Sequence, residues 1–123
     1  MHYMFLIYGN ETAIAETAPE EMEQHIAKNW SVVEEATRRG VLVGVGALQP
    51  TSTSTTIRPK DGKVLTTDGP FAETKEQLGG YYILDCADLD EAIGWAAKMP
   101  ACGGGCVEIR PLVEIPPDPR QDG

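Results

Sequence analysis

Two segments that are predicted as β-strands carry large apolar side chains on both faces, and this feature constrains the fold most strongly. The segments are Tyr3–Tyr8, with the sequence Tyr-Met-Phe-Leu-Ile-Tyr, and Tyr81–Asp85, with the sequence Tyr-Tyr-Ile-Leu-Asp. Successive side chains of a strand point to opposite faces of a sheet, so strands of this kind need cover on both sides. The sequence therefore predicts a sheet that has helices on one face and a further apolar partner on the other.

Two helices are predicted to supply one layer of cover. The first begins at Ala18–Glu21, where a proline and two acidic residues suit a first turn, and it ends at Gly40. The second begins near Asp88, whose spacing to Glu91 resembles a capping box, and it stops before Pro100. The stripe that the first helix is expected to bury consists of Met22, Ile26, Trp30, Val33 and Thr37.

The remaining apolar or β-branched segments predict further strands. They are Val41–Leu48, Thr51–Arg58, Val64–Thr67 and Val107–Val113, and the Asp61-Gly62 pair predicts a hairpin turn. This order of elements is typical of an α+β fold with a mostly antiparallel sheet and helices on one face. Because two helices cover only one face, the sequence predicts a homodimer that joins sheet to sheet.

Length and charge exclude several classes of protein. The chain of 123 residues suffices for one domain, which we predict at residues 1–115, followed by a loose tail at residues 116–123. The net charge of −9 disfavours binding to nucleic acid. No apolar run is long enough to span a membrane, and the start of the chain lacks the features of a signal peptide. We therefore expect a cytoplasmic protein without nucleic-acid or membrane partners.

The three cysteines, Cys86, Cys102 and Cys106, are predicted to be reduced and free of metal. An odd number of cysteines without a secretory signal does not indicate a disulfide framework. Cys102 and Cys106 flank three glycines, but a zinc site needs four ligands and no second pair follows. No phosphate-binding loop or dinucleotide fingerprint is present, so no cofactor is expected.

The block Thr-Asp-Gly-Pro-Phe-Ala-Glu-Thr-Lys-Glu, at residues 67–76, resembles the motif of a known family. The chain resembles the YCII-related proteins, and among them the subgroup named DGPF after the core of this motif. This resemblance covers residues 1–115 and implies a ferredoxin-like monomer that pairs into a dimeric α/β barrel, but no established reaction. Many family members are encoded beside extracytoplasmic-function sigma factors. The resemblance rests on His2–Gly9, Thr67–Glu76, Gly79–Tyr82, Asp85–Ala92 and Val107–Pro111.

The Asp68–Lys75 loop is the first candidate site. Its Gly69-Pro70 pair predicts a stiff turn, in which Asp68 accepts hydrogen bonds from nearby amides and serves as a catalytic carboxylate. We expect the Phe71 ring to be buried or to line a cavity, because its exposure would forgo roughly 1.5–3 kcal/mol. The alternative is a plain turn with solvated charges. The ligand-binding residues expected in this loop are Phe71, Glu73 and Lys75.

His25 is the second candidate catalytic residue, and Asn29 is its expected ligand-binding neighbour. The two are four residues apart, which places them side by side on the first helix, with Asn29 inside the apolar stripe and His25 at its edge. Polar groups on a buried face need partners, and a histidine beside a carboxylate can act as an acid or base. The alternative is a histidine that faces water.

Arg110 is a further ligand-binding candidate, because its guanidinium suits a substrate carboxylate. It shares a strand face with Glu108. The alternative for Arg110 is a cross-strand ion pair.

These residues together predict a small organic ligand in a pocket between the helices and the sheet, lined by the Asp68–Lys75 loop. His25 and Asp68 would supply acid–base chemistry without a cofactor. One alternative is a non-catalytic partner protein in a sigma-factor-linked stress circuit, and another is a stress protein without a ligand. An enzyme requires a titratable pair beside a cavity, whereas an interaction module requires an exposed apolar patch beyond the dimer interface.

Overall fold

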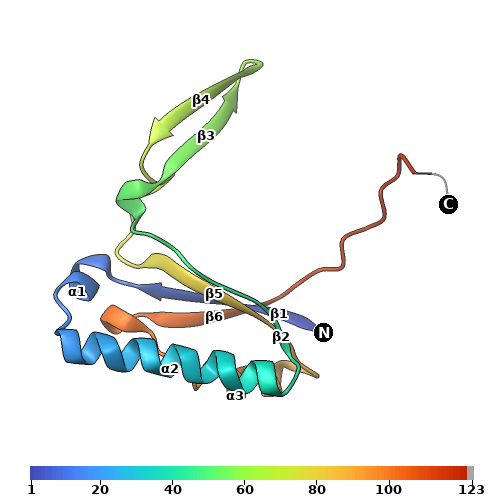
Figure 1. Cartoon of the computed structure of the whole chain (residues 1–123). Helices are drawn as coiled ribbons and strands as arrows, with labels where there is room; N and C mark the ends of the chain where they lie inside the picture. The colour runs from blue at the N-terminus through green and yellow to red at the C-terminus, as the bar shows by residue number, and fades with distance from the viewer. Residues whose placement is uncertain (122–123) are drawn as a thin grey trace.

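The computed structural model describes residues 1–121, with the exception of the Cys102 side chain. The chain forms a four-stranded sheet, helices that lie against one face of it, and a separate two-stranded ribbon that projects from one end (Figure 1). The sheet contains β1 (His2–Gly9), β2 (Leu42–Ala47), β5 (Gln77–Asp85) and β6 (Cys106–Pro111). The helices are α1 (Glu11–Ala15), α2 (Pro19–Arg38) and α3 (Leu89–Ala96), and the ribbon contains β3 (Thr55–Lys60) and β4 (Lys63–Asp68).

The strands of the main sheet lie in the order β2-β5-β1-β6, and every neighbouring pair is antiparallel. This arrangement is consistent with the predicted ferredoxin-like α+β fold. The two strands with apolar side chains on both faces, β1 and β5, occupy the centre, where Phe5 pairs with Tyr82 on one side and with Ile109 on the other.

The core lies between the sheet and the helices. Directly paired residues of antiparallel strands point to the same side, and one side of β1 and β5 is buried against α2 and α3. The buried residues from the sheet are Tyr3, Phe5, Tyr82 and Leu84, and those from the helices are Val32, Ala36, Ala92 and Trp95. No described helix covers the other side, which we call the open face. Its partly exposed residues are Met4, Leu6, Tyr8, Tyr81 and Ile83.

The buried side of α2 differs from the predicted stripe. Ile26 and Trp30 expose 49% and 68% of their surface and Thr37 is exposed, so the prediction that these three are buried is wrong. Val32 and Ala36, in the second half of α2, are buried in the core, whereas His25, Ile26 and Asn29, nearer its start, line a pocket. The inner side of α2 consists of Met22, His25, Asn29, Val32, Val33 and Ala36.

The ribbon β3–β4, which we call the arm, departs from the expected single sheet. Its strands pair only with each other, and the predicted strand Thr51–Arg58 begins instead with a 3₁₀ turn at Thr51–Thr53. The Asp61-Gly62 hairpin is confirmed. Both residues have positive φ angles, 52° and 74°, as the tight turn requires.

The predicted starts of both helices and the end of the first are confirmed by their caps, whereas α3 ends at Ala96, before the predicted stop at Pro100. Pro19 opens α2, and Gly40 follows its end with a φ of +72°. The Asp88 side chain accepts a hydrogen bond from the Glu91 amide at 2.9 Å, while the Glu91 carboxylate accepts one from the Ala87 amide at 3.3 Å. The short helix α1 was not predicted, although a capping asparagine precedes it.

The last strand is shorter than predicted, because β6 ends at Pro111 and an extended tail leaves the sheet (Figure 1). Residues 122–123 of the predicted tail lie outside the described residues, as does the side chain of Cys102. Cys86 and Cys106 are free thiols. None of the described helices is both long enough and apolar enough to cross a bilayer.

Candidate functional site

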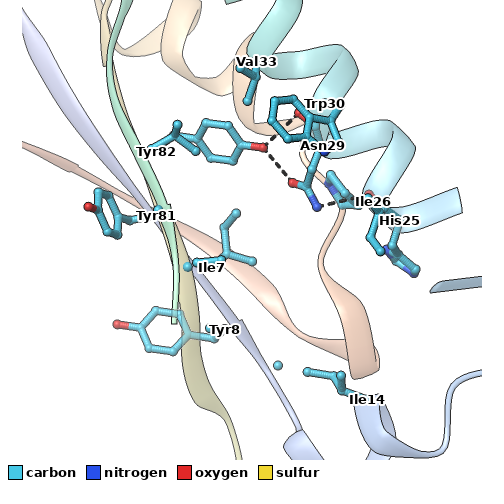
Figure 2. Close-up of a pocket in the computed structure, with 17 residues that line it drawn as sticks. Ile7, Tyr8, Ile14, His25, Ile26, Asn29, Trp30, Val33, Tyr81 and Tyr82 are labelled. Carbon is cyan, nitrogen blue, oxygen red and sulfur yellow. Dashed lines mark hydrogen bonds between the residues drawn. The ribbon is translucent and has the colours of Figure 1, made fainter. Parts of the chain in front are cut away.

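A pocket opens between α2 and the helix-facing side of the sheet, and we call it the α2 pocket (Figure 2). Its volume of about 440 Å³ lies within the range of small-molecule sites. The sheet contributes mainly Ile7, Val45, Ala47, Gly80 and Tyr82, and α2 contributes His25, Ile26, Asn29, Trp30 and Val33.

The pocket exists because small residues lie beneath the first half of α2. Gly80 on β5 pairs with Ile7 on one side and with Ala47 on the other. A Cβ atom at Gly80 would stand only 3.0 Å from the carbonyl oxygen of Gly46, so a larger residue would press on the neighbouring strand. The floor therefore lacks the bulky side chains that fill the rest of the core.

Tyr82 and Asn29 form the polar wall of the pocket. The Tyr82 hydroxyl donates a hydrogen bond to the Asn29 Oδ1 atom at 2.7 Å, and the Asn29 Nδ2 atom donates one to the His25 carbonyl oxygen at 3.1 Å. Figure 2 shows Asn29 between the two other residues. Burial raises the pKa of the Tyr82 phenol, which keeps the hydroxyl protonated as a donor. This chain of bonds fixes α2 over β5.

His25 lies on the α2 side of the pocket and is partly buried. Its Nδ1 atom is buried and has no hydrogen-bond partner among residues 1–121. The residues that line the pocket include no aspartate or glutamate, so the expected pairing of a histidine with a carboxylate is not formed there. His25 and Asn29 both line this pocket, and the predicted roles of His25 in catalysis and of Asn29 in ligand binding stay predictions.

The Asp68–Lys75 loop does not line the α2 pocket. The Phe71 ring is 76% exposed, so the expectation that it is buried is wrong. None of the described residues covers its apolar surface, because the loop turns outward at the root of the arm. The Asp68 carboxylate accepts no hydrogen bond from the described residues, contrary to the expected amide contacts. Glu73 and Lys75 are exposed.

The backbone of this loop explains its turn residues. Gly69 has a φ of +102°, which favours glycine, and its amide donates to the Ser54 carbonyl oxygen at 2.7 Å. The Thr56 hydroxyl donates to the Gly69 carbonyl oxygen at 2.7 Å, and Arg58 donates to that of Phe71 at 3.4 Å. The motif therefore closes the root of the arm.

Comparison with known proteins gives two matches. The profile of the YCII-related domain matches residues 1–116. The uncharacterized protein R00369 of Rhizobium meliloti (strain 1021) is 38% identical over 119 residues, which cover 95% of this chain and 96% of that protein. The chain belongs to the YCII-related family. Because this relative is itself uncharacterised, the family assignment brings no reaction to this YCII-related protein.

Arg110 of this YCII-related protein lies on the open face, opposite the α2 pocket. It pairs with Met4 and makes no ion pair with the described residues, so the alternative of a cross-strand ion pair is not formed. Glu108 lies on the same face, where burial and then the charge of Glu108 raise the pKa of the Tyr8 phenol. Any ligand of Arg110 would therefore be separate from a ligand beside His25.

Sequence reasoning missed Tyr82 and Trp30 as pocket residues. Tyr82 alternates in phase with Leu84, which is a signal that it faces the helices, and the preceding Gly79-Gly80 pair is a signal for an unfilled floor. Within the described part of the chain, no group of three metal-ligating side chains gathers, either in the pocket or elsewhere. The roles predicted for Asp68, Phe71, Glu73, Lys75 and Arg110 stay predictions.

Proposed function

We propose that this YCII-related protein binds a small, largely apolar organic molecule in the α2 pocket. The composition of the pocket wall carries the proposal. Most lining residues are apolar or glycine, and none of them is aspartate, glutamate, lysine or arginine. A charged ligand would lose its hydration without gaining an ion pair, so the wall favours a ligand that is neutral. His25 and Asn29 would meet a single polar group of that ligand.

The rim of the pocket supports the same conclusion. Trp30 and Ile26 are more exposed than a core residue of their size would be, and both border the opening. A ligand that covered them would remove apolar surface from water, which contributes roughly 25 cal/mol for each Å² buried. Exposed aromatic and aliphatic side chains around a concave site are a common feature of ligand binding.

His25 is the group we propose for any chemistry in this pocket. Histidine commonly transfers protons near neutral pH, and no other lining side chain is a carboxylate, thiol or amine. Asn29 and Tyr82 already bond to each other or to the backbone, so they would hold the ligand cavity in shape rather than exchange protons.

We also propose that the protein is a homodimer joined through the open face, as in the dimeric α/β barrel that membership in the DGPF subgroup would imply. The support is the row of apolar side chains on that face, which includes Leu6, Tyr81 and Ile83 and has no cover from the described helices. Packing two such sheets face to face would bury both rows.

The pocket can be tested with a neutral fluorescent dye, N-phenyl-1-naphthylamine. Ala47→Phe places a ring in the pocket from the edge strand, and we expect it to weaken dye binding at least about tenfold. Energy transfer from Trp30 provides the signal, since Trp30 lines the pocket whereas the other tryptophan, Trp95 of α3, does not. Leu48→Phe is the matched control, because Leu48 is the next residue, is exposed, and does not line the pocket.

Two results would contradict the proposal. One is an absence of dye binding to the wild-type protein. The other is equal weakening by Ala47→Phe and Leu48→Phe, which would place the dye outside the α2 pocket. His25→Phe adds a test of the polar contact, because it should spare the dye and weaken binding of a hydroxylated compound such as 2-naphthol.

A further inference from the structure

We infer that the arm, β3–β4, is an interaction surface whose partner is a second copy of this chain. The inference rests on the proposed homodimer and adds to it a contact outside the main sheet. Four observations carry it: the isolation of the arm, its two different faces, its anchored root and its charge.

The strands of the arm pair with no other strand of the described chain. β3 and β4 form hydrogen-bonded pairs only with each other, and all their residues except Thr56 are exposed. Figure 1 shows the ribbon projecting beyond the end of the main sheet. An isolated two-stranded ribbon is marginally stable in water at best. A ribbon of this kind therefore needs another surface to pack against.

The two faces of the arm differ in chemistry. Residues that pair directly across the ribbon share a face, so Ile57, Pro59 and Val64 lie together on one side. Ile57 and Val64 expose 61% and 64% of their surface, which makes this an uncovered apolar face. The opposite face carries Arg58, Lys60 and Lys63.

The chain itself covers part of the basic face and leaves the apolar face free. Thr56 and Arg58 on the basic face bind the carbonyl oxygens of Gly69 and Phe71, so the returning loop lies on that side. On the apolar face, none of the described segments covers Val64, which is 64% exposed.

Hydrogen bonds join the segments that lead into and out of the arm to the rest of the chain, which we call the body. On the outgoing leg, the Glu11 carboxylate accepts hydrogen bonds from the Thr51 amide at 2.7 Å and from the Thr51 hydroxyl at 2.8 Å. On the returning leg, the Asn10 side chain donates to the Lys75 carbonyl oxygen at 3.0 Å, and the Gln77 side chain accepts from the Glu11 amide at 2.9 Å. The fold therefore sets the direction in which the arm projects.

Charge identifies a second copy as the partner. Three of the ten lysines and arginines lie on the arm, with two of the nineteen acidic residues, so the arm carries +1 and the rest of the chain −10. The basic residues of the arm are attracted to the acidic body of another copy. A two-fold axis would let each copy cover the arm and the open face of the other.

Sedimentation velocity on matched variants tests this inference. Val64→Glu places a charge on the apolar face, and Leu65→Glu places the same charge on the opposite face, where Leu65 is 49% exposed. We expect Val64→Glu to raise the dimer dissociation constant at least about tenfold and Leu65→Glu to leave it within about twofold. Ile57→Glu should repeat the effect of Val64→Glu. Dye binding in the α2 pocket should persist in each variant, which would confirm that the body is folded.

The possible failures can be told apart. A wild-type protein that sediments as a monomer at micromolar concentration overturns both the proposed dimer and this inference. If the wild type is a dimer and Val64→Glu and Leu65→Glu weaken it equally, or not at all, this inference alone is overturned. The proposed contact through the open face then stays in place. Persistent dye binding in either case would leave the proposed ligand site intact.

Discussion

At the scale of single residues, hydrogen bonds from a few buried groups decide the form of the candidate site. Tyr82 links β5 to Asn29, and Asn29 links back to the His25 carbonyl oxygen, so three residues set the height of α2 above the sheet. The His25 Nδ1 atom is buried beside this chain without a partner in the described residues. The same chain of hydrogen bonds therefore holds α2 over the pocket and supplies polar groups to its wall.

Tyr82→Phe should lower the free energy of unfolding by about 1–2 kcal/mol, because the Asn29 oxygen loses its donor. Urea denaturation measures this change. Tyr81→Phe is the control, since Tyr81 lies on the partly exposed open face, and it should cost less than about 0.5 kcal/mol. Equal effects of the two substitutions would show that the bond to Asn29 contributes little.

Tyr82 should also make the stability of the protein depend on pH in the alkaline range. Burial raises the pKa of Tyr82 above its ordinary value of 10.0, so the unfolded chain releases this proton at lower pH than the folded chain does. The protonated Tyr82 phenol therefore makes its full contribution to the free energy of unfolding below pH 10.0. This contribution is lost as pH rises through the folded pKa. Tyr82→Phe should therefore show a shallower loss of stability above this pH than the wild type does.

Gly69→Ala tests the turn that closes the root of the arm. Gly69 has a φ of +102°, and a Cβ atom added there would meet nothing within 4 Å, so the cost comes from backbone conformation alone. We expect a loss of about 1 kcal/mol or more in the free energy of unfolding. The control, Gly94→Ala within α3, also meets open space and should be neutral or stabilising, since alanine favours helices. A neutral Gly69→Ala would contradict this account of the motif.

At the scale of elements, α2 and α3 are joined by a cluster of charges around one aromatic ring. The Glu35 carboxylate of α2 accepts from Lys98 at 2.9 Å and from Arg39 at 3.4 Å. Both cations lie over the buried ring of Trp95, at 4.9 and 5.1 Å from its centroid. The carboxylate thereby holds two cations against the indole, so the cluster fixes how the two helices meet.

Glu35→Gln should weaken this connection and change the response to acid. The hydrogen bond from Lys98 is the main cause that lowers the pKa of Glu35 below its ordinary value of 4.5. Its contribution is therefore present above pH 4.5 and is lost as pH falls through the folded pKa. In thermal unfolding, Glu35→Gln should lower the melting temperature slightly at neutral pH and by less at acidic pH. The effect should nearly vanish in 1 M salt, where ion pairs are screened. Glu34→Gln, on the exposed side of α2, serves as the control.

At the scale of the whole molecule, the chain leaves two apolar surfaces uncovered. The buried core of the described chain contains ten residues, all between the helices and one face of the sheet. The open face and the apolar face of the arm lie outside it. A second copy that covered both would add to the buried surface of a small domain, and this is the arrangement that the sedimentation experiment tests.

The sequence alone determined the features that depend on neighbouring residues. Proline and acidic residues begin α2 and a glycine follows its end, Asp88 caps α3, and the Asp61-Gly62 pair makes a hairpin, because backbone preference and capping act within a few residues. Runs of large apolar side chains that occupy both faces identified the central strands. The position of His25 beside Asn29 followed from helical spacing.

The tertiary structure decided which surfaces those elements bury. The predicted buried stripe of α2 runs through Trp30, whereas the observed one runs through Val32 and Ala36. The two differ by a rotation of the helix through part of a turn, and helical spacing alone permits both. Phe71 is exposed and the arm stands apart because no distant segment among the described residues packs against them. The α2 pocket joins residues from β1, β2, α2 and β5, and only the pairing of these strands brings a glycine floor beneath His25. Contacts between segments so far apart in the chain depend on the whole packing arrangement, which no local pattern specifies.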